Sequence, residues 1–364
     1  MKKMSTNSVK NHSRESLQKV TTTDQKQALL KAKAEEPDCR SHTVFRFRTP
    51  QTDVLPGRYA DTSKRLDKLM KRLHESGAAR PLARPALGWK DKLSKLIDIA
   101  PNFEKFLLTI VWPHLVLCEM GANPHWTPVL LVGGSGVGKS WIAQKLAELM
   151  DVQPLLIAMN SSQSNRDLCG SSVFWGNSSP GKLAEMVAWG IYSCPPVANN
   201  LVILDEVDKV TSDERLNTIE PLYNLLEEES AARFEDQSIP DVWISLDKTR
   251  FILTANSIES GIPEAILSRV TIFHIDQPSV EQSKRIASSM LCSIVDSFGV
   301  KLSLELPDAV LDLAAMESPR RCKSRLQISV ALAVAQKKDA VDMLTWKASD
   351  IGRKRVQSRR IGLT

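Results

Sequence analysis

Short, mostly apolar runs alternate with amphipathic segments over the middle of the chain. Such runs, apolar on both faces, are typical of strands in a parallel sheet. The segments Trp141–Met150, Lys182–Tyr192 and Asp213–Glu228 have apolar residues at helical spacing. This alternation predicts an α/β domain whose parallel sheet is flanked by helices. The predicted strands are Pro128–Val132, Pro154–Met159, Leu201–Glu206, Val242–Leu246 and Phe251–Asn256.

The last third of the chain shows only helical spacing. Helices are predicted at Ser279–Phe298, Pro307–Met316 and Pro319–Lys337, with a final turn after Trp346. This pattern predicts a small all-α domain that follows the α/β domain. The predicted divisions are residues 125–276 for the α/β domain, residues 277–352 for the helical domain and residues 353–364 for a basic tail.

The start of the chain is polar. Residues 1–56 are rich in Ser, Thr, Lys and Gln and poor in aromatic residues. Such a segment buries too little apolar surface to offset the entropy of ordering, so a disordered basic arm is predicted there. Within it, Val44–Arg48 alternates apolar and basic residues, which fits an edge strand or a docking peptide. Residues 57–124 are predicted to be helical, with Ala79–Gly88 as a Pro-rich linker.

The first predicted helix of that region, Tyr59–Leu73, carries basic residues around its apolar positions. Both a solvated basic face and a surface for an anionic partner fit this pattern. The formal charge of the whole chain is +6, a mild excess for a dedicated nucleic-acid binder. The six cysteines lack a C-x-x-C pair, which favours reduced thiols over a disulfide framework.

The longest apolar run, Phe106–Cys118, contains a proline and a histidine. It is shorter than the ~20 residues that span a bilayer, so a buried helix is the better interpretation. The polar residues after the first three also lack the apolar core of a signal peptide. We therefore expect a soluble, cytoplasmic protein without a membrane partner.

The strongest chemical signal is a glycine-rich loop between the first predicted strand of the sheet and the helix that begins at Trp141. In this context the backbone N–H groups turn toward an anion, and the helix dipole adds positive potential. Lys139 is expected to reach the β- and γ-phosphates of a nucleoside triphosphate, and Ser140 to offer its hydroxyl to Mg²⁺. The predicted nucleotide-binding residues here are Gly133, Gly134, Ser135, Gly136, Val137, Gly138, Lys139, Ser140 and Trp141.

Polar side chains end two of the predicted strands. Asp205 and Glu206 close one apolar run, and Asn256 closes another. Ligands of parallel α/β sheets lie outside the carboxyl ends of the strands. Asp205 is therefore expected to hold Mg²⁺, and Glu206 to orient or deprotonate the attacking water. Asn256 either hydrogen-bonds that water and the γ-phosphate or is a plain turn residue.

These motifs, in this order, resemble those of the AAA+ ATPases, and most of all the ATPase module of Lon protease. The resemblance covers roughly Thr127–Ile351. It implies ATP as the nucleotide, hydrolysis of ATP, and a homo-oligomeric ring, most simply a hexamer. The stretches that carry it are Gly133–Ser140, Asp205–Lys209, Thr254–Asn256 and Ile262–Arg269.

Two arginines take roles from this resemblance. Arg269 matches the arginine finger, which in the family reaches the γ-phosphate bound by a neighbouring subunit, and such a guanidinium in trans is worth ~10³–10⁵ in rate. Arg320 resembles the second sensor, which contacts the nucleotide of its own subunit from the helical lid. Arg321 is an alternative for that role, and Arg320 could instead be a surface residue at a helix start.

The segment after the second predicted strand looks like the part of Lon that carries the aromatic pore loop. Phe174, Trp175 and Gly176 would then grip a substrate chain, unless the two aromatic side chains are buried in the core. The stretch that follows is one residue longer than in Lon, which leaves the register of the loop open. The chain ends soon after the helical domain, so no peptidase domain is expected.

Three functions fit these observations. The first is a Lon-like ATPase that unfolds or remodels a protein substrate and has no protease activity of its own. The second is a related ATPase that acts on DNA or a nucleoprotein complex, favoured by the basic arm, the basic helix and the basic tail. The third is a switch or scaffold that binds ATP and barely hydrolyses it.

Overall fold

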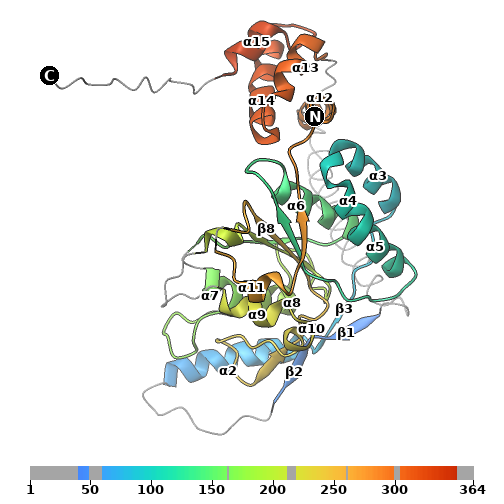
Figure 1. Ribbon diagram of the computed structural model, residues 1–364. Helices are drawn as coiled ribbons and strands as arrows, with labels where there is room; N and C mark the ends of the chain where they lie inside the picture. Colours follow the sequence, from blue (N-terminus) through green and yellow to red (C-terminus); the bar gives the residue numbers. More distant parts are fainter. Residues whose placement is uncertain are drawn as a thin grey trace, which may run out of the picture.

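The computed structural model describes residues 40–48, 60–161, 164–210, 219–259, 261–298 and 304–350 (Figure 1). Its centre is a five-stranded parallel sheet with the strand order β5-β6-β8-β4-β9. The predicted parallel α/β domain is therefore confirmed. The strands of this sheet are β4 (Val129–Val132), β5 (Leu155–Ala158), β6 (Leu201–Asp205), β8 (Arg250–Ala255) and β9 (Thr271–His274).

Two strands differ from the sequence prediction. β9 was not predicted, because its residues are only partly buried and include a threonine and a histidine. β7 (Val242–Ile244) is a strand as predicted, but it lies outside the main sheet and pairs antiparallel with β2 (Phe45–Phe47).

Both faces of the sheet are apolar, since side chains alternate along each strand. Leu130 and Val132 of β4 pack into one hydrophobic core, and Val129 and Leu131 pack into the other. The first core is covered by α7 (Ser164–Cys169), α8 (Lys182–Trp189), α9 (Glu220–Leu225) and α10 (Glu228–Ala231). The second is covered by α3 (Trp89–Ile99), a 3₁₀ turn (Pro101–Phe103), α4 (Glu104–Phe106), a π-turn (Leu107–Val111), α5 (Trp112–Glu119) and α6 (Lys139–Met150).

The predicted arm and linker both contain strands. β1 (Ser41–Thr43) pairs with β3 (Ala79–Pro81), and β2 pairs with β7. The prediction of a disordered arm up to residue 56 is thus wrong for residues 41–47, because Val44 and Phe45 are buried in the first core. The edge strand is the correct interpretation of Val44–Arg48. The rest of the predicted arm lies outside the described residues, except for Arg40 and Arg48.

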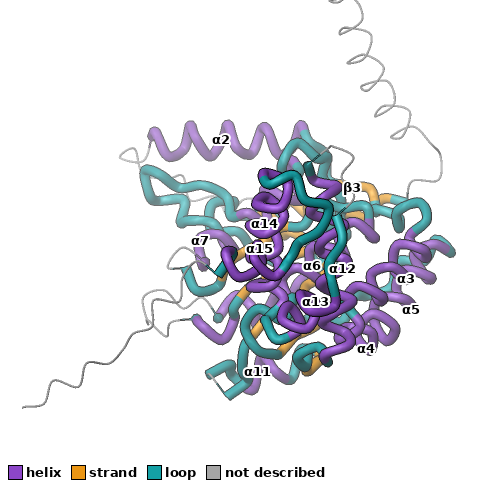
Figure 2. The backbone as a smooth tube through the Cα atoms, turned by 90° about the horizontal axis from the view of Figure 1, so that it is seen from above, coloured by secondary structure: helices purple, strands orange, loops and turns teal. Residues whose placement is uncertain are grey.

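The predicted N-terminal helical region is built into the α/β domain. Leu73 of α2 (Ala60–Glu75) packs into the first core, and Trp89, Leu93 and Phe106 pack into the second. Figure 2 shows α2 along one edge of the molecule. Of the predicted helix Asp213–Glu228, the structure describes α9 and the start of α10, and residues 211–218 lie outside the described part.

The C-terminal domain is helical, as predicted. It consists of α12 (Val280–Ser297), α13 (Asp308–Ala315), α14 (Pro319–Ala335) and α15 (Met343–Ala348) and lies above the sheet in Figure 1. Its helices share their own core, which includes Val310, Leu326 and Trp346. The Ser279 side chain and Gln282 form a capping box at the start of α12. The basic tail at residues 353–364 lies outside the described part.

None of the described helices is long and apolar enough to cross a membrane. α11 (Glu264–Leu267) and a 3₁₀ turn (Val207–Lys209) complete the described elements. The turn follows the carboxyl end of β6, and α11 precedes the start of β9.

Candidate active site

The glycine-rich loop joins β4 to α6, as predicted. Gly136 and Gly138 have φ angles of 84° and 107°, which side chains other than glycine rarely adopt. A Cβ atom on Gly133 would lie 2.3 Å from the backbone oxygen of Ile275. The loop can therefore pass close to the strand end only because these positions are glycine.

Lys139 begins α6 and is buried, with 7% of its surface exposed. Its Nζ donates hydrogen bonds to the backbone oxygens of Gly133 (2.6 Å) and Gly134 (3.0 Å) and to Asn256 Oδ1 (3.2 Å). Burial lowers the pKa of this ammonium group. A phosphate bound in the loop would offset that cost, because its negative charge favours the protonated form.

Asp205 sits at the end of β6 and accepts two short hydrogen bonds on Oδ1. Ser140 Oγ donates one at 2.6 Å, and Thr254 Oγ1 donates the other at 2.5 Å. A hydroxyl and a carboxylate are hard oxygen ligands of the kind Mg²⁺ prefers, and this metal is commonly held by one or two carboxylates together with substrate phosphates. The predicted pair of Ser140 and Asp205 therefore fits Mg²⁺.

Glu206 has a φ angle of 59°, an uncommon conformation for a residue with a side chain. Two contacts hold it there. Its backbone N–H donates to Thr254 Oγ1 at 3.0 Å, and its Oε2 accepts a hydrogen bond from Asn160 Nδ2 at 2.6 Å. The left-handed backbone turns the Glu206 side chain toward the cavity that the glycine-rich loop borders.

Asn256 follows β8 and is linked to the loop through Lys139. Its backbone N–H donates to Asp208 Oδ2 at 3.1 Å. The Asp208 side chain is fully buried and also lies 3.2 Å from Lys209 Nζ. Asn256 is thus fixed from two sides, and its amide faces the loop rather than solvent.

The sequence analysis predicted no role for three further side chains of this site, those of Asn160, Asp208 and Thr254. Each lies just beyond or at the end of an apolar strand, at the same sheet edge as Asp205. A polar residue near the end of an apolar strand could have indicated these three as well, but the prediction named only Asp205, Glu206 and Asn256.

A cavity of about 720 Å³, which is within the usual range for a small-molecule site, is bordered by the loop and by Lys139, Ser140, Asp205, Glu206, Thr254 and Asn256. Beyond the loop its walls carry apolar side chains, Leu96 and Phe103 from one segment and Ile286, Met290 and Ile294 from α12, together with lysines and serines of the same helices. A flat aromatic base fits between such walls. The cavity therefore has a phosphate end and an apolar end.

The helical domain contributes Arg320 to the cavity but not Arg321. Arg320 starts α14, and its backbone N–H lies 3.4 Å from the Gly136 oxygen. Arg321 instead pairs with Glu317 (3.0 Å) and Asp350 (2.9 Å). The geometry favours Arg320 as the lid residue that meets the nucleotide.

Arg269 does not line this cavity. It donates to the Ala265 oxygen at 2.7 Å, lies 3.5 Å from Glu227 Oε2 and packs 5.9 Å from the Tyr223 ring. Its guanidinium is held at the surface beside α9 and α11. The structure does not bring this residue together with the other predicted catalytic groups of the same chain.

The predicted pore-loop residues also lie away from the cavity. Phe174 and Trp175 are 58% and 68% exposed, so the alternative of burial in the core is wrong. The loop is closed by hydrogen bonds between Ser171 and Ser179. Both aromatic side chains are presented at the surface.

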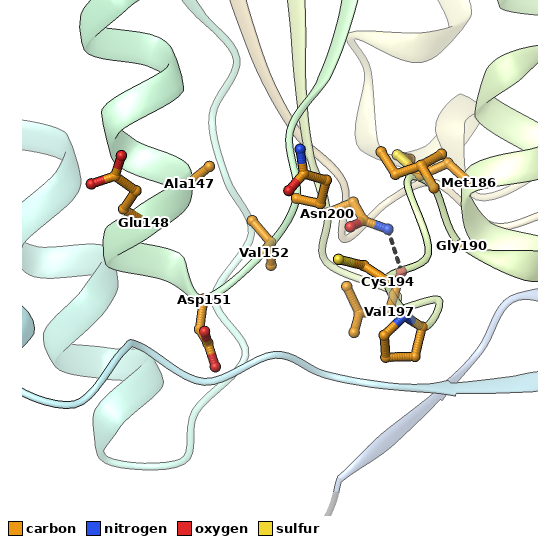
Figure 3. A pocket seen from close by; sticks show the side chains of 12 residues that line it. Ala147, Glu148, Asp151, Val152, Met186, Gly190, Cys194, Val197 and Asn200 are labelled. Carbon is orange, nitrogen blue, oxygen red and sulfur yellow. Dashed lines mark hydrogen bonds between the residues drawn. The ribbon is translucent and has the colours of Figure 1, made fainter. Parts of the chain in front are cut away.

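A second, smaller cavity of about 360 Å³ lies at the other end of α6 (Figure 3). It is bordered by Glu148 and Asp151 on one side and by Met186, Cys194 and Val197 on the other. None of the predicted site residues contributes to it.

The geometry is that of a phosphate-binding loop with an acidic strand end beside it, and comparison with known proteins agrees. Residues 128–270 match the model of the AAA domain (dynein-related subfamily). They are an AAA domain. The resemblance to the AAA+ ATPases that the sequence motifs indicated is thereby confirmed.

Several Lon proteases are distant relatives of this AAA domain. The chain is 30% identical over 169 residues to Lon protease of Mycoplasmopsis agalactiae, covering 46% of this chain and 16% of that protein. It is 29% identical over 223 residues to Lon protease of Mycoplasma genitalium, covering 59% of this chain and 27% of that protein. The matched segments thus span less than a third of these relatives.

Among solved structures, a mutant of RuvB from Thermotoga maritima matches with a TM-score of 0.47 and 14% identity, over 69% of each chain.

Proposed function

We propose that this chain hydrolyses ATP in a ring of identical subunits and uses the energy to remodel a protein substrate. The observation that carries the ATPase proposal is the convergence of Lys139, Asp205, Glu206 and Asn256 around one loop. The binding of ATP with Mg²⁺ follows from the AAA domain in general. Hydrolysis, the ring and the substrate are the proposed parts.

Each group has a distinct task in the proposed reaction. Lys139 and the loop N–H groups hold the phosphates. Ser140 and Asp205 would hold Mg²⁺, which would supply positive charge beside the bound phosphates. Glu206 orients the attacking water and takes its proton, and Asn256 donates a hydrogen bond to that water or to the γ-phosphate.

The position of Arg269 supports the proposed ring. A guanidinium that stabilises the transition state must reach the γ-phosphate, and Arg269 of the same chain does not line the cavity. In the proposed reaction it would therefore serve the cavity of a neighbouring copy. In such an assembly each active site is made by two subunits.

Mixed rings test this arrangement. Glu206→Gln subunits keep Arg269 but cannot activate water, and Arg269→Ala subunits keep the pocket but lack the guanidinium. Each variant alone should be nearly inactive, with turnover reduced ~10³-fold or more for the arginine. Mixing them should restore part of the activity, since some interfaces then join an intact pocket to an intact Arg269. Without recovery on mixing, in rings shown to contain both variants, the trans assignment is wrong.

The exposed Phe174 and Trp175 support a protein substrate, because such side chains can grip an extended polypeptide. An unfolded protein should stimulate ATP turnover, and Phe174→Ala and Trp175→Ala should abolish the stimulation while basal turnover stays. Phe298→Ala removes an exposed aromatic ring from the helical domain and is the matched control. If DNA stimulates turnover and unfolded proteins do not, the second function, an ATPase that acts on DNA, replaces the first.

A switch or scaffold with little hydrolysis is the least supported function. Glu206 and Asn256 are both held by several contacts at the phosphate end of the cavity, which a purely binding site does not need. A cytoplasmic location also remains part of the proposal.

A further inference from the structure

Helix α2 and the aromatic loop form one composite surface. The guanidinium of Arg65 donates hydrogen bonds to the backbone oxygens of Trp175, at 2.8 Å, and of Gly176. About two helical turns further on, the Arg72 guanidinium lies over the Trp189 ring, 4.2 Å from its centroid. The loop is therefore tied to the flank of a helix that belongs to the N-terminal part of the chain.

The outer face of α2 carries lysines next to this flank. Lys64, Lys68 and Lys71 are exposed, and in the part of the chain that the structure describes none of them forms an ion pair. Residues three and four positions apart are neighbours on a helix surface, so Lys68 adjoins both Arg65 and Arg72. Asp67 and Glu75 lie on the same helix, but five lysine and arginine side chains against these two carboxylates leave residues 64–75 with a net positive charge beside the exposed rings of the loop.

Arg65 fixes the position of the loop backbone. It binds main-chain oxygens rather than the rings, so Trp175 stays 68% exposed while its backbone is fixed. Because these contacts are made to main-chain atoms, they restrain the loop without covering the aromatic rings. A loop whose backbone is already restrained loses little further backbone entropy when its indole stacks on a flat partner.

We propose that this surface binds single-stranded nucleic acid, with phosphates on the lysines and bases stacked on Trp175 and Phe174. Proteins that bind single strands combine a basic track for the backbone with aromatic side chains for the bases. This proposal goes beyond the remodelling of a protein, which requires no nucleic acid.

The spacing of the lysines fits a nucleic-acid strand better than an acidic peptide. Lys64 and Lys71 are about 10 Å apart along the helix axis, at ~1.5 Å per residue. Along the axis of a stacked strand, successive phosphates rise by ~3.4 Å, so four of them span a similar axial length. A strand also offers a flat base at every step, whereas an acidic peptide offers flat groups only where its sequence has them.

Binding of a labelled oligothymidylate, followed by fluorescence anisotropy over a series of salt concentrations, tests the phosphate contacts and the base stacking separately. The double variant Lys64→Ala/Lys68→Ala should reduce the slope of log K against log salt by ~1.4, at ~0.7 for each lost phosphate contact. Trp175→Ala should weaken binding about 5- to 150-fold with an unchanged slope, because stacking is worth ~1–3 kcal/mol per base.

The matched control is Lys105→Ala/Lys347→Ala, which removes the same charge from exposed helical positions outside this surface. It should leave both the affinity and the slope close to those of the unaltered protein. Equal losses in the control and in the α2 variant would overturn the proposal, since binding would then follow net charge alone.

Two further outcomes would also overturn it. If polyglutamate binds and oligothymidylate does not, the partner is an acidic polypeptide. If duplex DNA binds as tightly as the single strand and Trp175→Ala has no effect, the rings do not stack on bases. These measurements need no ATP hydrolysis, so a failure of the proposed ATPase and a failure of this surface are told apart.

Discussion

Asn160 Nδ2 lies 2.6 Å from Glu206 Oε2, and the two residues follow neighbouring strands of the sheet. The hydrogen bond fixes the carboxylate that we propose activates water. A hydrogen bond to a charged group is worth ~1.5–3 kcal/mol. Asn160 therefore acts through Glu206 and is a positioning residue.

The first prediction concerns this contact. Asn160→Ala should lower the kcat of ATP hydrolysis about tenfold and leave the KM for ATP nearly unchanged, because the phosphate-binding groups are not touched. Steady-state ATPase assays give both values. A rise in kcat would instead mean that the hydrogen bond restrains Glu206 from reaching the water.

Thr254 provides the second prediction. Its hydroxyl donates to Asp205 and accepts from the Glu206 N–H, and the residue is 1% exposed. Thr254→Val keeps the shape but removes a hydrogen-bond partner from two part-buried polar groups, at a cost of ~1–3 kcal/mol. Urea unfolding should show this loss, and the Mg²⁺ concentration needed for half-maximal ATPase activity should rise.

Thr249 is the matched control for this change. It is also a buried threonine in the same part of the chain, but its hydroxyl has no hydrogen-bond partner among the residues that the structure describes. Thr249→Val should therefore leave stability unchanged or raise it slightly, with no effect on the Mg²⁺ dependence. If both variants lose the same stability, the Thr254 hydroxyl has no special role.

Close backbone packing at the phosphate loop gives the third prediction. Gly133→Ala would place a Cβ atom 2.3 Å from the Ile275 oxygen, so the loop must shift. Nucleotide binding, measured by calorimetry, should fall by at least tenfold. Gly176→Ala adds the same methyl group where no atom lies within 4 Å, and it should bind nucleotide normally.

The linear motifs indicated the phosphate loop and the acidic pair because each role there depends on residues that are neighbours in sequence. The partners that orient these groups come from other strands. Asn160 is 46 residues from Glu206, and Thr254 is 49 residues from Asp205. Such contacts follow from the strand order of the sheet, which apolar runs alone do not specify.

The N-terminal part of the fold was harder to predict for a related reason. β2 pairs with β7, which lies far along the chain at Val242–Ile244, and a short strand such as Phe45–Phe47 is stable only with that partner. Local composition favoured a disordered arm. The tertiary pairing and the burial of Phe45 overrode it.

A buried histidine gives the fourth prediction. His114 accepts a hydrogen bond from Arg250 Nε at 3.0 Å, and burial, followed by the charge of Arg250, lowers its pKa from 6.5 to about 3. The unfolded chain therefore binds a proton below pH 6.5 that the folded chain does not. Stability should fall as the pH drops from 6.5, with about 2 kcal/mol lost to this group at pH 5.

His114→Gln removes the titrating group and can keep an acceptor for Arg250. The difference in unfolding free energy between pH 7 and pH 5 should be about 2 kcal/mol smaller in this variant than in the unaltered protein. Urea titrations at both pH values measure it. An identical pH dependence in the two proteins would show that His114 titrates alike in the folded and unfolded states.

Asp236 should act in the opposite direction, and this is the fifth prediction. It is 2% exposed and accepts hydrogen bonds from the Gly181 N–H at 2.7 Å and from Ser238, at the base of the aromatic loop. Burial raises its pKa from 3.8 to about 6. The folded chain therefore keeps a proton that the unfolded chain has lost, and stability should fall as the pH rises from 3.8 to 6.

Asp236→Asn tests this sign. The variant stays uncharged at every pH, so between pH 5 and pH 7 it should lack the loss of stability, ~1 kcal/mol, that ionisation of Asp236 causes. Because the contribution of His114 runs the other way, only the difference between variant and unaltered protein isolates Asp236. If that difference does not change with pH, the carboxylate is ionised in the folded state throughout, and its hydrogen bonds to Gly181 and Ser238 outweigh the cost of burial.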